Sequence, residues 1–157
     1  LEKGSDAPTF FLKNLDGTNF FLSDVLEKNK KPIFLSFFAT WCVPCIEEMP
    51  ILDSLKNIYS GTDFYLINVS GLYQGGVKLK EKPDKVRELI KKLDVDIPVL
   101  MDKYGLTAKK YGALSLPRTV IINNKGKISY LHTGFKKSDV ANIVKEITRV
   151  SKNKIKK

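Results

Sequence analysis

Continuous apolar runs divide the chain into predicted strands. Residues Ile33 to Phe38 are apolar at all but one position, as expected for a strand buried on both faces of a sheet. Phe64 to Val69 has the same character. Shorter strands are predicted at Val99 to Met101, Thr119 to Asn123 and Lys127 to Thr133.

Helical patterns alternate with these strands. The segment 42–59 is predicted to be helical and to kink at Pro50. Its apolar stripe comprises Ile51, Leu55, Ile58 and Tyr59. Further helices are predicted from about Pro83 to Leu93, from Leu106 to Tyr111 and from Ser138 onward. Alternating helices and buried strands are typical of an α/β fold with a layered sheet.

Turn residues mark the other boundaries. Phe10 to Leu12 and Phe20 to Leu22 flank a turn at Asp16-Gly17, which predicts an N-terminal β-hairpin. A short helical turn is expected at Ser23-Asp24. The glycines that predict a loop after the second buried strand are Gly71, Gly75 and Gly76.

Size and composition favour one domain. With 157 residues and 43% hydrophobic composition, the chain predicts a single domain (1–157), with a basic flexible tail over about 151–157. No run of about 18 apolar residues is present, so no transmembrane helix is predicted. The chain begins at Leu1 rather than at methionine, which suggests that a signal peptide or membrane anchor has been removed.

The charge is strongly basic. Lys and Arg number 27 against 17 Asp and Glu, for a net charge of +10, which favours anionic lipid or acidic partners. The lysines are spread over predicted helix faces and the tail, and no nucleic-acid-binding motif accompanies them. Nucleic acid is therefore not expected as a partner.

The most informative motif is Cys42-Val43-Pro44-Cys45, which contains the only two cysteines. Thiols three residues apart at a helix start lie on one face at close to the separation a disulfide requires. Unpaired N–H groups and the helix dipole stabilise an anion in the first turn, so Cys42 is expected to have a lowered pKa and to attack disulfides. Cys45, one turn deeper, is expected to resolve the mixed disulfide.

Two other uses of the pair are considered. A purely structural disulfide would close a very short loop and remove little chain entropy, so it would be an inefficient staple. A zinc site needs four ligands, and no second cysteine pair or histidine cluster supplies them. No metal site is therefore predicted, and the only redox group expected is the Cys42-Cys45 disulfide, with no further cofactor.

Three segments in order resemble one family. Residues 37–45 (FFATWCVPC) with Glu47-Glu48-Met49-Pro50, the opening 4–10 (GSDAPTF), and 111–122 (YGALSLPRTVII) followed by 126–128 (GKI) resemble thioredoxin-like proteins of the TlpA/ResA/CcmG group, the AhpC/TSA-type redoxins. The resemblance implies a thioredoxin-like fold: a central mixed sheet flanked by helices, an N-terminal hairpin and a strand-helix insertion at about Gly71 to Asp96.

The resemblance also assigns a substrate-binding segment. The proline that matches Pro117 has a cis peptide bond in this fold and lies against the cysteine pair. Leu116 would then offer backbone N–H and C=O groups to an extended substrate strand. Trp41 matches the tryptophan that covers the cysteines. Pro44 resembles the reducing thioredoxin type more than the oxidising CPHC type, so these four residues form the expected substrate contact.

Glu48 is the expected proton carrier. It lies three residues after Cys45 and therefore one turn deeper on the same side of the helix. A buried carboxyl there would have its pKa raised toward neutrality and could exchange a proton with Cys45. The TlpA-like group has a glutamate at this position. Ordinary thioredoxins instead use a strand aspartate, whose matching position here is Ser36, and Glu47 is expected to face solvent.

The resulting function is a thiol-disulfide oxidoreductase that reduces protein disulfides outside the cytoplasm, in the periplasm or at a membrane anchor. By resemblance, its clients would be disulfides and CxxC pairs of proteins in cytochrome c maturation or oxidase copper-site assembly. A membrane or periplasmic thioredoxin-like protein would supply its electrons. Two alternatives remain. A Sco-like Cu(I) chaperone would use both thiolates plus His132, although Sco proteins have CxxxC. A thiol peroxidase is disfavoured because the Pro and Thr of its loop are Leu35 and Ala39 here.

Overall fold

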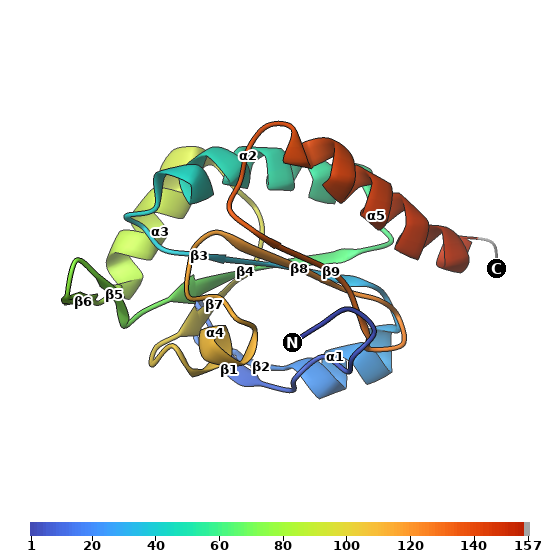
Figure 1. Cartoon of the computed structure of the whole chain (residues 1–157), viewed down its shortest axis with the longest axis horizontal. Coiled ribbons are helices and arrows are strands. Elements are labelled where there is room, and N and C mark those ends of the chain that lie inside the picture. The colour runs from blue at the N-terminus through green and yellow to red at the C-terminus, as the bar shows by residue number, and fades with distance from the viewer. Residues whose placement is uncertain (156–157) are drawn as a thin grey trace.

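A seven-stranded mixed sheet forms the centre of the structure (Figure 1). The computed structural model describes the backbone of residues 1–155 and the side chains of residues 1–151. The strands of the sheet, in spatial order, are β2 (Asn19–Phe21), β1 (Phe11–Asn14), β7 (Val99–Asp102), β4 (Asp63–Val69), β3 (Ile33–Phe38), β8 (Arg118–Ile122) and β9 (Ile128–Thr133). The three strands β7, β4 and β3 are parallel, and the outer pairs are antiparallel. The predicted mixed α/β sheet and the N-terminal hairpin are therefore confirmed.

Helices cover both faces of this sheet. They are α1 (Leu22–Asn29), α2 (Val43–Ile58), α3 (Pro83–Leu93), α4 (Leu106–Lys110) and α5 (Asp139–Ile155). Figure 1 shows α2, α3 and α5 on one face and α1 and α4 on the other. Helix α5 extends into the segment predicted as a tail, and residues 156–157 lie outside the described residues. No helix within the described residues is long and apolar enough to cross a membrane.

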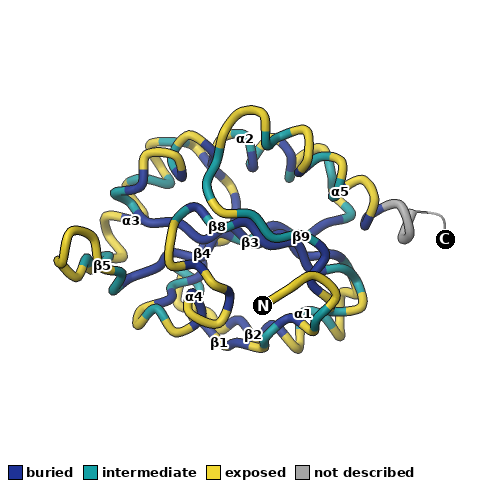
Figure 2. Tube along the Cα trace, viewed as in Figure 1, coloured by how far each residue is buried: buried dark blue, intermediate teal, exposed yellow. Residues whose placement is uncertain are grey.

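The two faces hold separate apolar cores, because successive residues of a strand point to opposite sides. On β3, Ile33, Leu35 and Phe37 join the core beneath α1 and α4. Phe34 and Phe38 join the core beneath α2, α3 and α5, together with both cysteines. All six positions of β3 are buried, which explains its continuous apolar run (Figure 2). Ser36 is the polar exception and faces the α2 side.

The predicted glycine loop is instead a small hairpin. Strands β5 (Leu72–Gln74) and β6 (Val77–Leu79) pair with each other and not with the central sheet. Gly75 and Gly76 both have positive φ, 57° and 80°, which is the geometry of a two-residue turn that glycine adopts without steric cost. The predicted strand-helix insertion is therefore present as this hairpin followed by α3.

Two helices differ from their predictions. Helix α1 is eight residues long, whereas a single turn was expected at Ser23-Asp24. On α2 the buried face is rotated from the predicted stripe: Ile58 is 67% exposed, whereas Met49 and Leu52 are fully buried. The rotation follows from the helix start, because the face that carries Cys45 is the one turned to the sheet. The helix includes Pro50 and continues to Ile58.

Candidate active site

The cysteine pair lies where β3 ends and α2 begins. Cys42 is the N-cap residue of α2, with extended backbone geometry, and Cys45 lies in the first turn. The two form a disulfide with a Cα–Cα distance of 5.3 Å. The backbone N–H of Cys45 donates a hydrogen bond of 3.3 Å to the Cys42 sulfur. The pairing predicted from the spacing is confirmed, and the Cys42 sulfur occupies the position that a helix N-terminus offers to an anion.

Apolar residues surround this disulfide. Cys42 and Cys45 are both buried, and Trp41 and Leu116 pack against the same apolar core while remaining partly exposed. Val43 and Pro44 are exposed. Trp41 and Leu116, which are 75 positions apart in the numbering, are thus brought to the same core as the cysteines, whereas Pro44 faces outward.

Glu48 lies one turn deeper on α2 and is almost completely buried, with 1% of its surface exposed. Its neighbour Glu47 is exposed, as expected. Burial raises the pKa of the Glu48 carboxyl to about 7, because the charged form loses its hydration inside the protein. The carboxyl is therefore close to half-ionised at neutral pH, the condition in which one group can both accept and return a proton.

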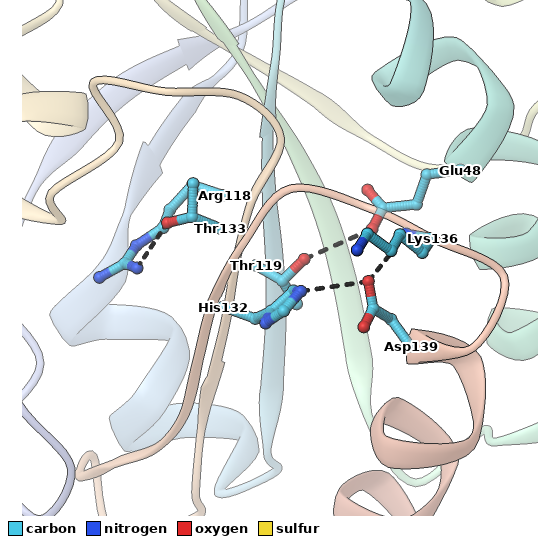
Figure 3. Close-up of polar contacts among 7 residues, drawn as sticks. All are labelled: Glu48, Arg118, Thr119, His132, Thr133, Lys136 and Asp139. Carbon is cyan, nitrogen blue, oxygen red and sulfur yellow. Dashed lines mark hydrogen bonds and ion pairs between the residues drawn. The ribbon is translucent and has the colours of Figure 1, made fainter.

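Two strands supply the hydrogen bonds that hold this carboxyl. The hydroxyl of Ser36 on β3 donates to Glu48 Oε1 at 2.8 Å. The hydroxyl of Thr119 on β8 donates to Oε2 at 3.4 Å, as Figure 3 shows. Both bonds favour the ionised form and lower the pKa of Glu48, against the larger effect of burial. Each oxygen thus has its own donor, and α2 is fixed across the β3–β8 pair.

The segment after α4 approaches the site through a cis peptide bond between Leu116 and Pro117. The Pro117 carbonyl accepts a hydrogen bond of 2.7 Å from Gly134 N–H. Arg118 fixes the segment from the other side, since its Nε donates to the Tyr111 carbonyl at 3.1 Å. Within the part of the chain that the structure describes, no hydrogen bond occupies the N–H or C=O group of Leu116.

A carboxylate from the insertion holds the loop before Cys42. Glu81 accepts hydrogen bonds from the backbone N–H and the hydroxyl of Thr40, the latter at 2.8 Å. It also accepts from Asn68 Nδ2 at 2.9 Å, and its own N–H donates to Ser70 Oγ. Glu81 therefore ties the insertion and the end of β4 to the turn that presents Trp41 and Cys42.

Sequence reasoning missed three of these partners. The sequence pattern assigns no role to Thr119 or Glu81, and it marks Ser36 only as a residue that cannot replace the thioredoxin aspartate. The sequence signal is weak: Ser36 is the one polar position in the run 33–38, and Thr119 lies between Arg118 and the apolar run Val120 to Ile122. A buried hydroxyl in such a strand needs a hydrogen-bond partner, which is a hint of a polar contact without indicating which residue provides it.

His132, the only histidine, lies on β9. Its Nε2 is 3.1 Å from Asp139 Oδ2 at the start of α5. Among the described residues, no three His, Cys, Asp or Glu side chains are grouped as metal ligands.

A cavity of about 640 Å³ lies on another part of the surface. It is lined by residues of β1, β7 and α4, among them Phe11, Met101 and Leu106, and neither cysteine contributes to it. Beside the disulfide, the side chains of Val43 and Pro44 are exposed, whereas both cysteines are buried.

A mixed sheet of this order with a CxxC disulfide at the start of α2 and a cis proline before β8 defines a thioredoxin-like thiol-disulfide oxidoreductase. The chain belongs to the Redoxin family, whose model matches residues 2–147.

Relatives agree with this assignment. The chain is 36% identical over 134 residues to the thioredoxin-like protein YneN of Bacillus subtilis, covering 85% of this chain and 73% of that protein. It is 32% identical over 128 residues to the thiol-disulfide oxidoreductase ResA of Bacillus thuringiensis, covering 82% of this chain and 68% of that protein. Among solved structures, one described as thiol:disulfide interchange protein DsbE from Chlorobium tepidum has a TM-score of 0.82 at 25% identity, covering 96% and 99% of the two chains. The protein is a thiol-disulfide oxidoreductase of the ResA/DsbE type.

Proposed function

We propose that this oxidoreductase works as a reductant of protein disulfides outside the cytoplasm. The observation that carries the proposal is the placement of Glu48, a fully buried carboxyl with a pKa of about 7 one turn below Cys45. Such a group can take the proton that Cys45 must lose before it becomes a nucleophile at neutral pH.

The cycle begins with both cysteines reduced. The Cys42 thiolate attacks one sulfur of a substrate disulfide, that S–S bond breaks, and the departing substrate thiolate takes a proton from water. Cys45 then transfers its thiol proton to the Glu48 carboxylate and attacks the Cys42 sulfur. The second substrate thiolate leaves and is protonated by water. Two electrons have moved from the enzyme dithiol to the substrate, and the enzyme holds its Cys42–Cys45 disulfide.

Substrate binding rests on Leu116 and its surroundings. The unengaged N–H and C=O groups of Leu116 support backbone pairing with an extended substrate segment beside the cysteines. Trp41 and Pro44 supply apolar contact, and the exposed Val43 and Leu114 extend it. Backbone pairing is insensitive to side-chain identity, so the enzyme would accept cysteine-containing segments of varied sequence.

The clients we propose are oxidised CxxC pairs in exported proteins, such as the haem-attachment cysteines of apocytochrome c or cysteines of an oxidase copper site. A membrane-bound or periplasmic thioredoxin-like protein would return the enzyme to its dithiol form. The similarity to a ResA and to a DsbE supports this proposal, in which the protein works outside the cytoplasm, either exported or held at the membrane.

The first experiment is the reduction potential of the cysteine pair. The protein is equilibrated in dithiothreitol or glutathione buffers while the fluorescence of Trp41, the only tryptophan, reports the redox state. A value near the about −270 mV of thioredoxin supports a reductant, whereas one near the about −120 mV of strongly oxidising enzymes contradicts it. A second assay follows reduction of a disulfide-closed CxxCH peptide by the dithiol enzyme, with Cys42→Ser as the inactive control.

A further inference from the structure

A row of polar side chains extends from Glu48 toward the protein surface (Figure 3). Ser36 on β3 pairs in register with Thr119 on β8, and Thr119 pairs in register with His132 on β9. Directly opposed residues of neighbouring strands point to the same face of a sheet, with Cβ atoms about 5 Å apart. The three side chains therefore form one line beneath α2 and α5.

Each end of this row carries an acidic side chain from a different helix. Glu48 of α2 accepts hydrogen bonds from Ser36 and Thr119 at the inner end. Asp139 of α5 meets His132 at the outer end, where Asp139 Oδ2 also accepts from Lys136 N–H at 2.8 Å. The His132 side chain is 37% exposed and that of Asp139 only 14%. The outer end thus reaches solvent, and the inner end does not.

The two carboxyl groups interact through space. The negative charge of Asp139 contributes to the raised pKa of Glu48, after the larger effect of burial. The same two carboxylates and Glu146 act on Tyr130, which lies on β9 beside His132 and has a raised pKa mainly because of burial. Glu146 is itself paired with Arg149. Of the ionisable side chains in this row, Glu48 is buried, whereas the His132–Asp139 pair is partly exposed to solvent.

We propose that Glu48 and the His132–Asp139 pair exchange protons as one coupled unit, so that His132 releases a proton to solvent when Glu48 gains one. His132 and Asp139 would then be positioning residues for the acid-base step. Histidine suits this place because it gains and loses protons close to neutral pH. Coupling of this kind makes the protonation of each site depend on the charge of the other.

The inference rests on the proposed function, because this proton exchange starts when Cys45 is deprotonated in the catalytic cycle. Cys45 gives its proton to the Glu48 carboxylate, which becomes neutral. The protonated His132 loses the attraction of that negative charge and passes one proton to water at the surface. The net result is one proton released from His132 to solvent for the one that passes from Cys45 to Glu48, and the proton on Glu48 stays beneath the bound substrate.

A purely structural role of the His132–Asp139 pair would lead to a different prediction. Asp139 lies in the first turn of α5 and accepts from Lys136 N–H, three residues earlier, which is the backward contact that an acidic residue makes in a capping box. Capping explains Asp139 without any role for Glu48. In that case the protonation of His132 would be indifferent to the charge of Glu48.

The test uses His132 as a single reporter. The imidazole C–H signal is followed by NMR across pH in the oxidised protein without substrate, in wild type, Glu48→Gln and Glu47→Gln. Coupling predicts that Glu48→Gln lowers the pH of half-protonation of His132 by about 0.3 or more, because a neighbouring negative charge is lost. Glu47→Gln removes the same charge from an exposed position and is expected to leave the curve in place.

A reciprocal experiment guards against a fold defect in one variant. Asp139→Asn keeps an acceptor for Lys136 N–H and removes the charge, so the carboxyl ¹³C signal of Glu48 is expected to titrate at lower pH by about 0.3 unit or more. If the His132 titration curve were unchanged in Glu48→Gln and the Glu48 curve unchanged in Asp139→Asn, the coupling would be overturned. Asp139 would then have only its helix-capping role. Because neither measurement involves a substrate, a failure of the reductase proposal would appear separately, as absent disulfide turnover with the coupling intact.

Discussion

The hydroxyl of Ser36 donates a hydrogen bond of 2.8 Å to Oε1 of Glu48, which joins strand β3 to the helix that carries the cysteines. Both residues are 1% exposed. In ordinary thioredoxins, which the chain resembles in outline, the strand supplies the carboxyl. Here the helix supplies the carboxyl and the strand supplies its donor, so the buried carboxyl and the cysteine pair belong to one helix.

Ser36→Ala tests this relationship. The hydrogen bond from Ser36 stabilises the ionised carboxyl, so its loss is expected to raise the pKa of Glu48 further, by about half a unit to one unit. The pH dependence of disulfide exchange should move to higher pH by the same amount. Ser54→Ala removes an exposed hydroxyl from the same helix and serves as the control. A profile that does not move in Ser36→Ala would separate this bond from the acid-base step.

Glu48 also makes stability depend on pH. Its pKa rises from 4.5 to about 7 on folding, so between these values the folded protein holds a proton that the unfolded chain has released. The contribution of this group to the free energy of unfolding is therefore fully present below about pH 4.5. It is lost as pH rises toward 7, by a total on the order of 3 kcal/mol. Glu48→Gln is expected to abolish this decline and to be the more stable protein at pH 8.

Urea unfolding of the oxidised protein at pH 5, 6, 7 and 8 measures the effect. Glu47→Gln is the matched control, because it removes an exposed carboxyl next to Glu48. The difference in free energy of unfolding between Glu48→Gln and wild type should grow with pH, whereas that of Glu47→Gln should stay constant. If the difference in free energy of unfolding did not change with pH in either variant, the pKa of Glu48 in the folded protein would be close to its value in the unfolded chain.

Glu81→Gln is expected to loosen the turn before the cysteines. A glutamine can present one acceptor oxygen, whereas the carboxylate serves both donors of Thr40 and the Asn68 amide. Losing a charged acceptor from a partly buried network costs about 1–2 kcal/mol. We expect a stability loss of that size in urea and a several-fold slower disulfide exchange. The exposed Glu88 on α3 provides the control, Glu88→Gln, in which both quantities should be unchanged.

The parts of this molecule that sequence predicts well are those encoded locally. The apolar run 33–38 matches β3 residue for residue, and the cysteine pair has the geometry that its spacing implies. The hairpin β5–β6 differs from the predicted loop, because adjacent glycines suit either one and only the structure shows the two positive φ angles of a tight turn. The rotated face of α2 was missed because apolar residues lie on several sides of that helix, and only packing selects one.

The polar partners of the site were not predictable in this way. Thr119 and His132 reach Glu48 and Asp139 because β8 lies beside β3 and β9 beside β8. That adjacency is set by the whole sheet, and the contacts join residues 71 positions apart in the case of Glu48 and Thr119. The sequence offered only the presence of hydroxyl side chains in buried strands, whereas their register decides what they bind.

The two cysteines should differ sharply in reactivity once the disulfide is reduced. Cys42 caps α2, where the N–H of Cys45 and the helix dipole favour a thiolate, whereas Cys45 lies inside the first turn above the carboxyl of Glu48. A limiting amount of iodoacetamide at pH 7 is therefore expected to label Cys42 at least about tenfold faster than Cys45, as measured by peptide mass spectrometry. In Glu48→Gln the labelling of Cys42 should keep its rate, because the helix N-terminus is unchanged. Equal labelling of the two cysteines in wild type would contradict the division into an attacking and a resolving thiol.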